Sequence, residues 1–125
     1  MKTPLDPRHQ RRKVCVQALF AWGFNDTKTP NPLAIEVIAN QKKIDEMISV
    51  CAPEWPLSQI NRLDLAILRL AVYEMIINKS QPLKVIIDEA VELAKEFGSE
   101  SSPSFINGCL GAVLKYLEAQ KNGTQ

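Results

Sequence analysis

Residues 61–78 read NRLDLAILRLAVYEMIIN, and this stretch decides the fold class of the 125-residue chain. Asn61 is a favoured N-cap residue, and Asp64 follows three positions later, which resembles a capping box. Leucine, isoleucine, valine and methionine then recur on two faces of a helix, and Arg69 and Glu74 are its main charged interruptions. A helix that is apolar on most sides must be covered by other elements, so the stretch predicts the central helix of a bundle.

Start and stop signals on both sides of this stretch predict four further helices. Asp6-Pro7 and Asn31-Pro32 are pairs of an N-cap and a first helical residue, and Gly98 is a usual C-terminal cap. The expected helices cover about 7–24, 32–52, 83–97 and 103–117. Nothing alternates with a period of two for long enough to form a sheet. We therefore expect an all-α fold, a single compact bundle of about five to six helices.

Composition limits the classes of function. With 46% hydrophobic and 23% charged residues, the chain fits one globular domain over residues 1–125, with flexible tails expected at 1–6 and 119–125. No apolar run approaches the roughly 18 to 20 residues that cross a bilayer, and the N-terminal residues lack the apolar stretch typical of a secretion signal, so we expect none. We expect a cytoplasmic protein without a membrane partner. The three cysteines are far apart and fit no disulfide framework or CxxC site, so we expect buried thiols.

The sequence offers no catalytic or metal-binding set of residues. A nucleophile, a base and an orienting group are needed for covalent catalysis, and His9 is the only histidine. Asp88, Glu92 and Glu96 lie four apart with Glu89 nearby, and we expect them to form a solvated helix face rather than a metal site. We therefore expect no enzyme, no metal and no cofactor.

The first helix carries the basic charge. Residues 1–13 hold five Lys and Arg against one Asp, a net +4, which leaves −3 for the rest because the whole chain has +1. At about 100° per residue, Arg8, Arg11 and Arg12 fall within roughly one third of the helix circumference. Cations at this end oppose the helix dipole, so stability does not explain them, whereas guanidinium forks match phosphate oxygens. We expect an exposed stripe that binds RNA, with His9 as a further surface donor; solvated charges on a frayed end are the alternative.

A second stripe on the same helix consists of Val16, Phe20 and Phe24, spaced four apart and turned by about 90° or more from the face expected to meet the core. Aromatic side chains away from the core predict a surface for a protein partner. The alternative is that the second helix covers them.

Several short blocks in order along the chain carry a resemblance to a known family. They are RR at 11–12, QALF at 17–20, PEWP at 53–56, AILRLAVYE at 66–74, EAVELAK at 89–95, FG at 97–98 and FING at 105–108. Together they resemble the NusB family of transcription antitermination factors over nearly the whole chain, although any one block alone is a weak signal.

The resemblance implies an adaptor that binds boxA RNA together with ribosomal protein NusE and helps the transcription elongation complex read through terminators, notably in ribosomal RNA operons. Carried over by position, the RNA-binding side comprises Arg8, Arg11, Arg12, Lys95, Ser101, Phe105 and Asn107. The NusE-binding side comprises Phe20, Phe24 and Asp64. Phe105 would stack an unpaired base and Asn107 would read a base edge. Packing of Phe105 into the core and loop capping by Asn107 stay open as alternatives.

The chain also departs from the family pattern. Phe20 replaces the usual tyrosine, and Asp64 is shorter than the commoner glutamate. The segment between positions 22 and 55 is short, and we expect one helix there where relatives usually have two. Gly108 and Gly111 inside a helix are expected to permit close approach of a neighbouring helix.

Two other functions stay open from the sequence. One is a stand-alone NusB-like RNA-binding domain, related to that of ribosomal RNA cytosine methyltransferases, and the other is a helical scaffold for proteins. Salt separates RNA binding from a scaffold, because phosphate binding weakens steeply between about 50 and 200 mM salt. We expect that replacing Arg8, Arg11 and Arg12 together by alanine abolishes boxA RNA binding and leaves melting nearly unchanged.

Overall fold

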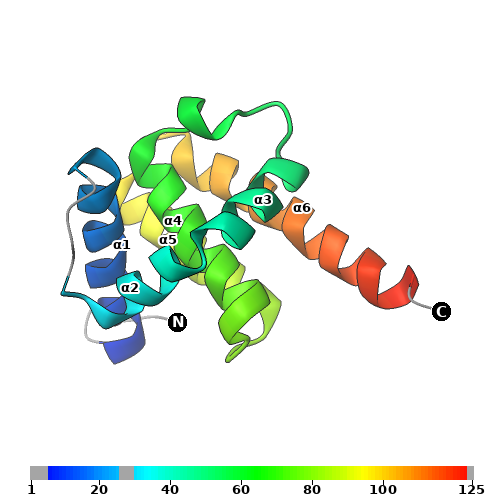
Figure 1. Cartoon of the computed structure of the whole chain (residues 1–125), viewed down its shortest axis with the longest axis horizontal. Coiled ribbons are helices and arrows are strands. Elements are labelled where there is room, and N and C mark those ends of the chain that lie inside the picture. Colours follow the sequence, from blue (N-terminus) through cyan, green and yellow to red (C-terminus); the bar gives the residue numbers. More distant parts are fainter. Residues whose placement is uncertain (1–5, 26–29, 124–125) are drawn as a thin grey trace.

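The computed structural model describes residues 6–25 and 30–123 as a bundle of helices (Figure 1). The helices are α1 (Pro7–Asn25), α2 (Pro32–Ala39), α3 (Gln41–Cys51), α4 (Arg62–Tyr73), α5 (Leu83–Phe97) and α6 (Ser102–Gly123). A short 3-10 helix, η1 (Leu57–Gln59), precedes α4, and a π-helix, η2 (Glu74–Asn78), continues it. No strand occurs in these two described ranges, and the predicted all-α fold is confirmed.

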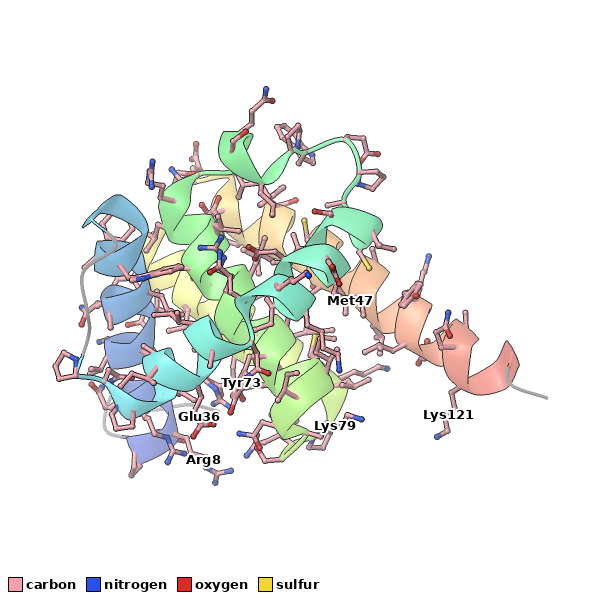
Figure 2. All side chains as sticks on the ribbon, in the orientation of Figure 1. Arg8, Glu36, Met47, Tyr73, Lys79 and Lys121 are labelled. Atoms are coloured by element: carbon pink, nitrogen blue, oxygen red, sulfur yellow. The ribbon has the colours of Figure 1, made fainter. Side chains whose placement is uncertain are left out.

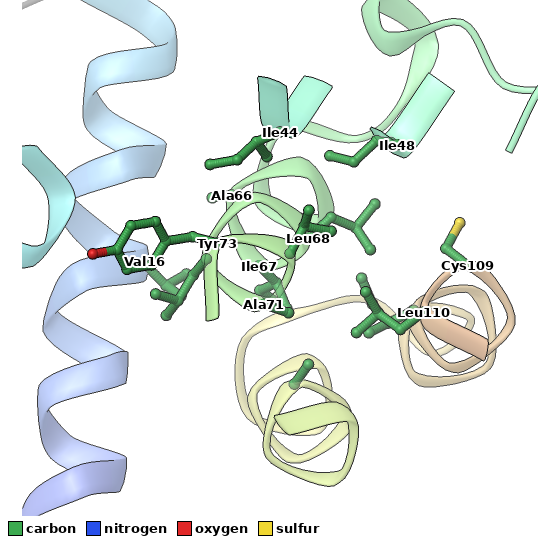
Figure 3. Close-up of a cluster of buried hydrophobic side chains, with 14 of the residues drawn as sticks. Val16, Ile44, Ile48, Ala66, Ile67, Leu68, Ala71, Tyr73, Cys109 and Leu110 are labelled. Carbon is green, nitrogen blue, oxygen red and sulfur yellow. The ribbon is translucent and has the colours of Figure 1, made fainter. Parts of the chain in front are cut away.

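Helix α4 is the centre of the bundle, as its apolar sequence predicts. It contacts each of the other five α-helices, and seven of its hydrophobic residues are buried: Ala66, Ile67, Leu68, Leu70, Ala71, Val72 and Tyr73. Figure 3 shows side chains of α1, α3 and α6 meeting on it, with Val16, Ile44 and Leu110 on its different sides. The Asn61 side chain accepts hydrogen bonds from the backbone N–H groups of Leu63 and Asp64, which confirms the predicted N-cap.

The segment between α1 and η1 holds two helices, so the expectation of a single helix there is wrong. Asn31 caps α2 by accepting a hydrogen bond from the backbone N–H of Ala34 at 2.8 Å. Asn40 ends α2, because its side-chain amide donates to the Glu36 carbonyl at 2.8 Å and its backbone leaves helical geometry at φ −107° and ψ 16°. The apolar spacing runs across this break, since Val37 of α2 and Ile44 of α3 are both buried.

Gly98 is the C-cap of α5, as its sequence position predicts, whereas the glycines inside α6 have a different role from that expected. Gly98 follows α5, and a Cβ placed there would lie 2.5 Å from the Ser102 Cβ and 2.8 Å from the Ala94 carbonyl oxygen. Gly108 and Gly111 have open space where a Cβ would point, so the expectation that they permit close helix approach is wrong. They face away from the neighbours of α6.

Helix α6 is longer than expected and projects from the bundle at its C-terminal end (Figure 1). It continues to Gly123, so residues 119–123, which we expected to form part of a flexible tail, are helical. Of the rest of the expected tails, Asp6 is described, and residues 1–5 and 124–125 lie outside the described residues.

The cysteines are free thiols in the core or at its edge. Cys15 and Cys109 are buried as expected, whereas Cys51 is half-buried. Burial raises the pKa of Cys15 to about 12 and that of Cys109 to about 11, so both thiols stay protonated at neutral pH.

Candidate nucleic-acid interface

The basic helix α1 begins at a capped end. The Asp6 carboxylate accepts a hydrogen bond from the Arg8 backbone N–H at 2.9 Å, as the Asp6-Pro7 signal predicts. This hydrogen bond lowers the pKa of Asp6, so the cap is charged at neutral pH. The cap therefore fixes the start of α1 as a regular helix, and Arg8 and Arg11 project from its first two turns.

Arg12 does not belong to an exposed stripe, and this part of the sequence prediction is wrong. Its side chain is 8% exposed and makes two hydrogen bonds to Glu74, from Nε at 2.8 Å and from Nη2 at 2.7 Å. Its Nη1 also lies 3.5 Å from the carboxylate of Glu89. Arg12 therefore ties α1 to the end of α4 and to α5, because a buried guanidinium requires paired anions.

His9 is buried as well, so the expectation of a surface donor is also wrong. Its Nδ1 lies 3.4 Å from Glu89, and its Nε2 contacts the carboxylate of Glu96. Lys13, one turn later, lies 3.4 Å from Glu96 and 5.7 Å from the centre of the Phe97 ring. The inner face of α1 is thus bound to α5 by charged groups.

The carboxylates of α5 are therefore not simply a solvated face. Glu89 is buried between His9 and Arg12, whereas Asp88 is exposed, as expected. Burial acts to raise the pKa of Glu96, but hydrogen bonds and charges from His9 and Lys13 outweigh burial and hold the pKa below its ordinary value. Glu96 therefore stays ionised at neutral pH.

Arg8 and Arg11 remain exposed and form one wall of a groove. Among the described residues, neither guanidinium forms an ion pair. The groove has a volume of about 350 Å³ and lies between the start of α1, the start of α2 and the segment that follows α4. Its other lining residues include Asn31, Glu36, Tyr73, Asn78, Ser80 and Gln81. Figure 2 shows Arg8, Glu36 and Tyr73 close together at this end of the bundle.

A tyrosine and a glutamate lie side by side in this groove. The Tyr73 hydroxyl donates a hydrogen bond to the carboxylate of Glu36, which joins α4 to α2. Burial, and then this hydrogen bond, raises the pKa of Tyr73 to about 12. The hydroxyl is therefore a fixed donor at neutral pH, and Glu36 is an exposed carboxylate that is held in place.

The weaker RNA candidates lie around the corner between α5 and α6. Lys95 is exposed and lies 3.3 Å from Glu92, and the Ser101 and Ser99 hydroxyls are 3.3 Å apart. Asn107 is exposed on the first turns of α6. The contacts of His9 and Lys13 with Glu96 bring α1 to the same end of α5, so the basic helix and this corner are neighbours.

Phe105 stands out among these candidates, because it is half-buried beside an exposed tryptophan. Its ring and that of Trp55 are 5.8 Å apart between centroids and nearly perpendicular, at 80°. Trp55 is 49% exposed. It lies in the loop before η1, far from Phe105 in the sequence. In the sequence, Trp55 stands out only as part of the PEWP block at 53–56, and no local signal predicts its place beside Phe105.

The residues proposed for a protein partner do not form one exposed patch. Val16 is fully buried and Phe20 is half-buried against the core, so helices cover much of this second stripe. The side chain of Phe24 lies outside the described residues. Asp64 is buried in the first turn of α4, and its Oδ1 has no hydrogen-bond partner among the residues that the structure describes.

Two kinds of feature are missing from the described part of the chain. It contains no group of three or more histidines, cysteines, aspartates or glutamates arranged to hold a metal ion. None of its helices combines the length and the apolar character needed to cross a membrane.

Sequence comparison relates the chain to known proteins. The family model described as "NusB family" matches residues 31–115, which leaves α1 outside the match. The transcription antitermination protein NusB of Roseiflexus castenholzii is 51% identical over 81 residues, covering 62% of this chain and 57% of that protein. The corresponding protein of Acetivibrio thermocellus is 48% identical over 89 residues, covering 71% of this chain and 61% of that protein. The chain thus spans less than two thirds of the length of these relatives.

Solved structures share the fold over most of the chain. T. maritima NusB matches with a TM-score of 0.77 and 32% identity, covering 92% of this chain and 93% of that one. A chain of the crystal structure of antitermination factors NusB and NusE in complex with dsRNA matches with a TM-score of 0.73 and 20% identity, covering 89% and 99%. At that identity the second match shows the fold alone.

Proposed function

Because this chain belongs to the NusB family, we propose that it is an RNA-binding adaptor of transcription antitermination that binds boxA-type nascent RNA together with NusE. In this proposal the protein acts within the transcription elongation complex by binding, without catalysing a reaction. The relatives named transcription antitermination protein NusB and the structure of NusB with NusE and dsRNA support these partners.

The observation that carries the RNA-binding role is a pair of guanidiniums on α1 that form no ion pair with any residue in 6–25 or 30–123. Arg8 and Arg11 are exposed and project from a helix whose inner face is fixed by the contacts of Arg12 with Glu74 and Glu89. A cation at a helix N-terminus is unfavourable for stability, and neither Arg8 nor Arg11 forms an ion pair with a described residue, which favours an external anion. Guanidiniums contact phosphate oxygens with two parallel hydrogen bonds, which suits the RNA backbone.

The corner between α5 and α6 supplies groups for reading bases. The ring of Phe105 and the exposed ring of Trp55 offer aromatic faces and edges on which an unpaired base could stack. The exposed amide of Asn107 lies one half-turn after Phe105 and can donate to or accept from a base edge. In this proposal Lys95 and Ser101 bind phosphates that flank these bases.

For NusE, we propose a contact at the start of α4 and along the outer part of α1. The buried Oδ1 of Asp64 has no hydrogen-bond partner in the described part of the chain, and a buried acceptor without a hydrogen bond costs about 1 to 3 kcal/mol of stability. A donor from NusE would recover this energy. Replacing Asp64 by Asn keeps the size of the side chain, and we expect weaker NusE binding in calorimetry with unchanged boxA RNA binding in the absence of NusE.

A titration of boxA RNA against a scrambled RNA tests the RNA-binding role. We expect the Arg8→Ala/Arg11→Ala variant to lose most of its affinity for boxA RNA and to melt like the unmodified protein. A control variant, Lys42→Ala/Lys84→Ala, removes the same charge from exposed positions of α3 and α5. If both variants bind boxA RNA equally well, the proposed site is wrong.

Salt dependence gives a second readout of the same site. Loss of two phosphate contacts to single-stranded RNA should reduce the slope of log affinity against log salt by about 1.4. An unchanged slope would mean that Arg8 and Arg11 do not contact RNA phosphates, and it would favour the alternative function of a helical scaffold for proteins. The same titration with NusE added reports whether the two partners bind together.

A further inference from the structure

The groove beside Arg8 and Arg11 has the size of a site for a small ligand. Its volume of about 350 Å³ is near the lower end of the usual range for such pockets, roughly 300 to 1,000 Å³. A helix or a nucleic-acid duplex is much wider than such a groove. One unpaired nucleotide with its phosphate at the rim is of suitable size.

The floor of the groove is neutral and fixed. Arg12 and Glu74 both line it as an ion pair with hydrogen bonds of 2.7 and 2.8 Å, so their opposite charges offset each other. Above this pair, Arg8 and Arg11 are available to an anion, whereas Glu36, held by Tyr73, presents a carboxylate. Two cations that form no ion pair with a described residue, beside a carboxylate with capacity to accept further hydrogen bonds, match a ligand that carries both an anion and hydrogen-bond donors.

The third wall is made by an irregular backbone segment. Helix α4 widens into the π-helix η2, in which the Lys79 N–H donates to the Glu74 carbonyl at 2.9 Å. Lys79 then adopts a left-handed conformation with φ 57° and ψ 30°, the only non-glycine residue with positive φ in the described ranges. π-Helical turns and left-handed non-glycine residues are uncommon and frequently occur at functional sites. Here Asn78 is the last residue of the π-helix and precedes the left-handed Lys79, and the chain then brings Ser80 and Gln81 to the groove.

Polar side chains of this wall can recognise a base. Amide groups of Asn78 and Gln81 offer both donors and acceptors, and carboxylates such as Glu36 accept hydrogen bonds from exocyclic amino groups. A phosphate can accept hydrogen bonds from the amides, but it is repelled by a carboxylate, so Glu36 would disfavour a site for a simple anion. The combination therefore favours a nucleotide over a simple phosphate.

We infer that this groove holds one unpaired nucleotide of the bound RNA, with its phosphate on Arg8 and Arg11 and an amino-bearing base between Glu36 and the amides of Asn78 and Gln81. The inference rests on the proposed RNA-binding function and adds a base-reading site to it. The site lies against α2 and η2, whereas the corner of α5 and α6 lies on the side of α1 where His9 and Lys13 contact α5.

Abasic scanning of the RNA tests the inference. Each nucleotide of boxA RNA is replaced in turn by an abasic unit, which removes the base and keeps the phosphate. We expect one position at which base removal weakens binding roughly 5- to 100-fold in the unmodified protein but has little further effect in the Asn78→Ala/Gln81→Ala variant. Gln59→Ala, at an exposed position in η1, is the control and should show the same scan as the unmodified protein.

The arginine variant separates failure of this inference from failure of the proposed function. If Arg8→Ala/Arg11→Ala weakens RNA binding and the abasic scan is the same with and without Asn78 and Gln81, the nucleotide site is wrong and the RNA-binding function stands. If the arginine variant binds RNA like the unmodified protein, both are wrong.

Nuclear magnetic resonance with small probes examines the groove directly. AMP and CMP should shift the side-chain amide signals of Asn78 and Gln81, and UMP, which lacks an exocyclic amino group, should shift them less. Ribose 5-phosphate and inorganic phosphate carry the anion without a base. Equal shifts with these two probes would reduce the groove to an anion site, and absence of any shift with AMP and CMP at millimolar concentrations would also overturn the inference.

Discussion

Replacing Arg12 by methionine should destabilise the protein much more than replacing its exposed neighbours. Methionine fills part of the same volume and removes the charge, so the buried carboxylates of Glu74 and Glu89 lose their guanidinium partner. Their side chains are 7% and 8% exposed, so water cannot replace that partner fully. The variant therefore tests whether Arg12 is structural.

The magnitude follows from the burial of the pair. Removal of one partner from a buried ion pair costs about 3 to 5 kcal/mol, because an uncompensated charge stays behind. A domain of this size has a total stability of about 5 to 15 kcal/mol. For a chain between 100 and 150 residues, we expect the melting temperature to fall by about 10 to 20 °C.

Urea unfolding followed by the fluorescence of Trp22 and Trp55 measures the change. The double variant Arg12→Met/Glu74→Met removes both charges, and it should recover a large part of the lost stability because the floor of the groove becomes apolar. If Arg12→Met unfolds at the same urea concentration as the unmodified protein but no longer binds RNA, the assignment of Arg12 to the fold is refuted. Because Arg12 is buried on Glu74 and Glu89, the triple replacement of Arg8, Arg11 and Arg12 should also destabilise the fold, contrary to the expectation from sequence that melting stays nearly unchanged.

Three further variants test other features of the structure. Gly98→Ala should destabilise by about 1 to 3 kcal/mol in urea unfolding, because the new Cβ would lie 2.5 Å from Ser102; a neutral result would contradict this corner geometry. Lys79→Gly should stabilise by about 1 kcal/mol, because glycine adopts the left-handed conformation without strain; a loss of stability would argue against the π-helical end of α4. Because the pKa of Glu96 is lowered, its contribution with His9 is present above the ordinary value of 4.5 and is lost as the pH falls through the folded value. The melting temperature of the unmodified protein should therefore fall more than that of Glu96→Gln as the pH falls below about 4.5. Parallel curves of melting temperature against pH would refute the contact between His9 and Glu96.

Local signals predicted most of the helices. Asp6, Asn31 and Asn61 occupy cap positions as expected, because a cap depends on a few neighbouring residues. The apolar faces of residues 61–78 identified the central helix, because burial on most sides leaves a clear mark on composition. The change to a π-helix after Tyr73 left no such mark, since the same residues suit both helix types.

The break at Asn40 shows why one helix was expected in place of two. Val37 and Ile44 are seven residues apart, which is two helical turns, so an uninterrupted helix would also place them on one face. Asn40 was the available signal, because asparagine competes for backbone hydrogen bonds and favours helix ends. Its side chain does so here with the carbonyl of Glu36.

The candidate site was only partly predictable, because the helical wheel gives an angle and not a neighbour. Arg8, Arg11 and Arg12 share one side of α1, yet only Arg12 meets Glu74, which is 62 positions away in sequence. Glu74 is a charged interruption in an apolar helix, and a carboxylate buried at such a position requires a cation. The groove itself combines residues from α1, α2 and the segment after α4, and no local pattern connects them.

The charge asymmetry of the sequence has a different meaning once the contacts are known. The acids that make the body of the protein negative include Glu74, Glu89 and Glu96, and these bind the inner face of α1 through Arg12, His9 and Lys13. Much of the basic charge on this helix is therefore used to position it, and two guanidiniums are left for an external anion. The salt dependence that α1 contributes should correspond to about two phosphates, a slope near −1.4 for single-stranded RNA, rather than the roughly −2.1 that three exposed arginines would give. Positioning by a buried charge network also explains how two arginines suffice, because α1 cannot turn them away from the groove without breaking the Arg12 contacts.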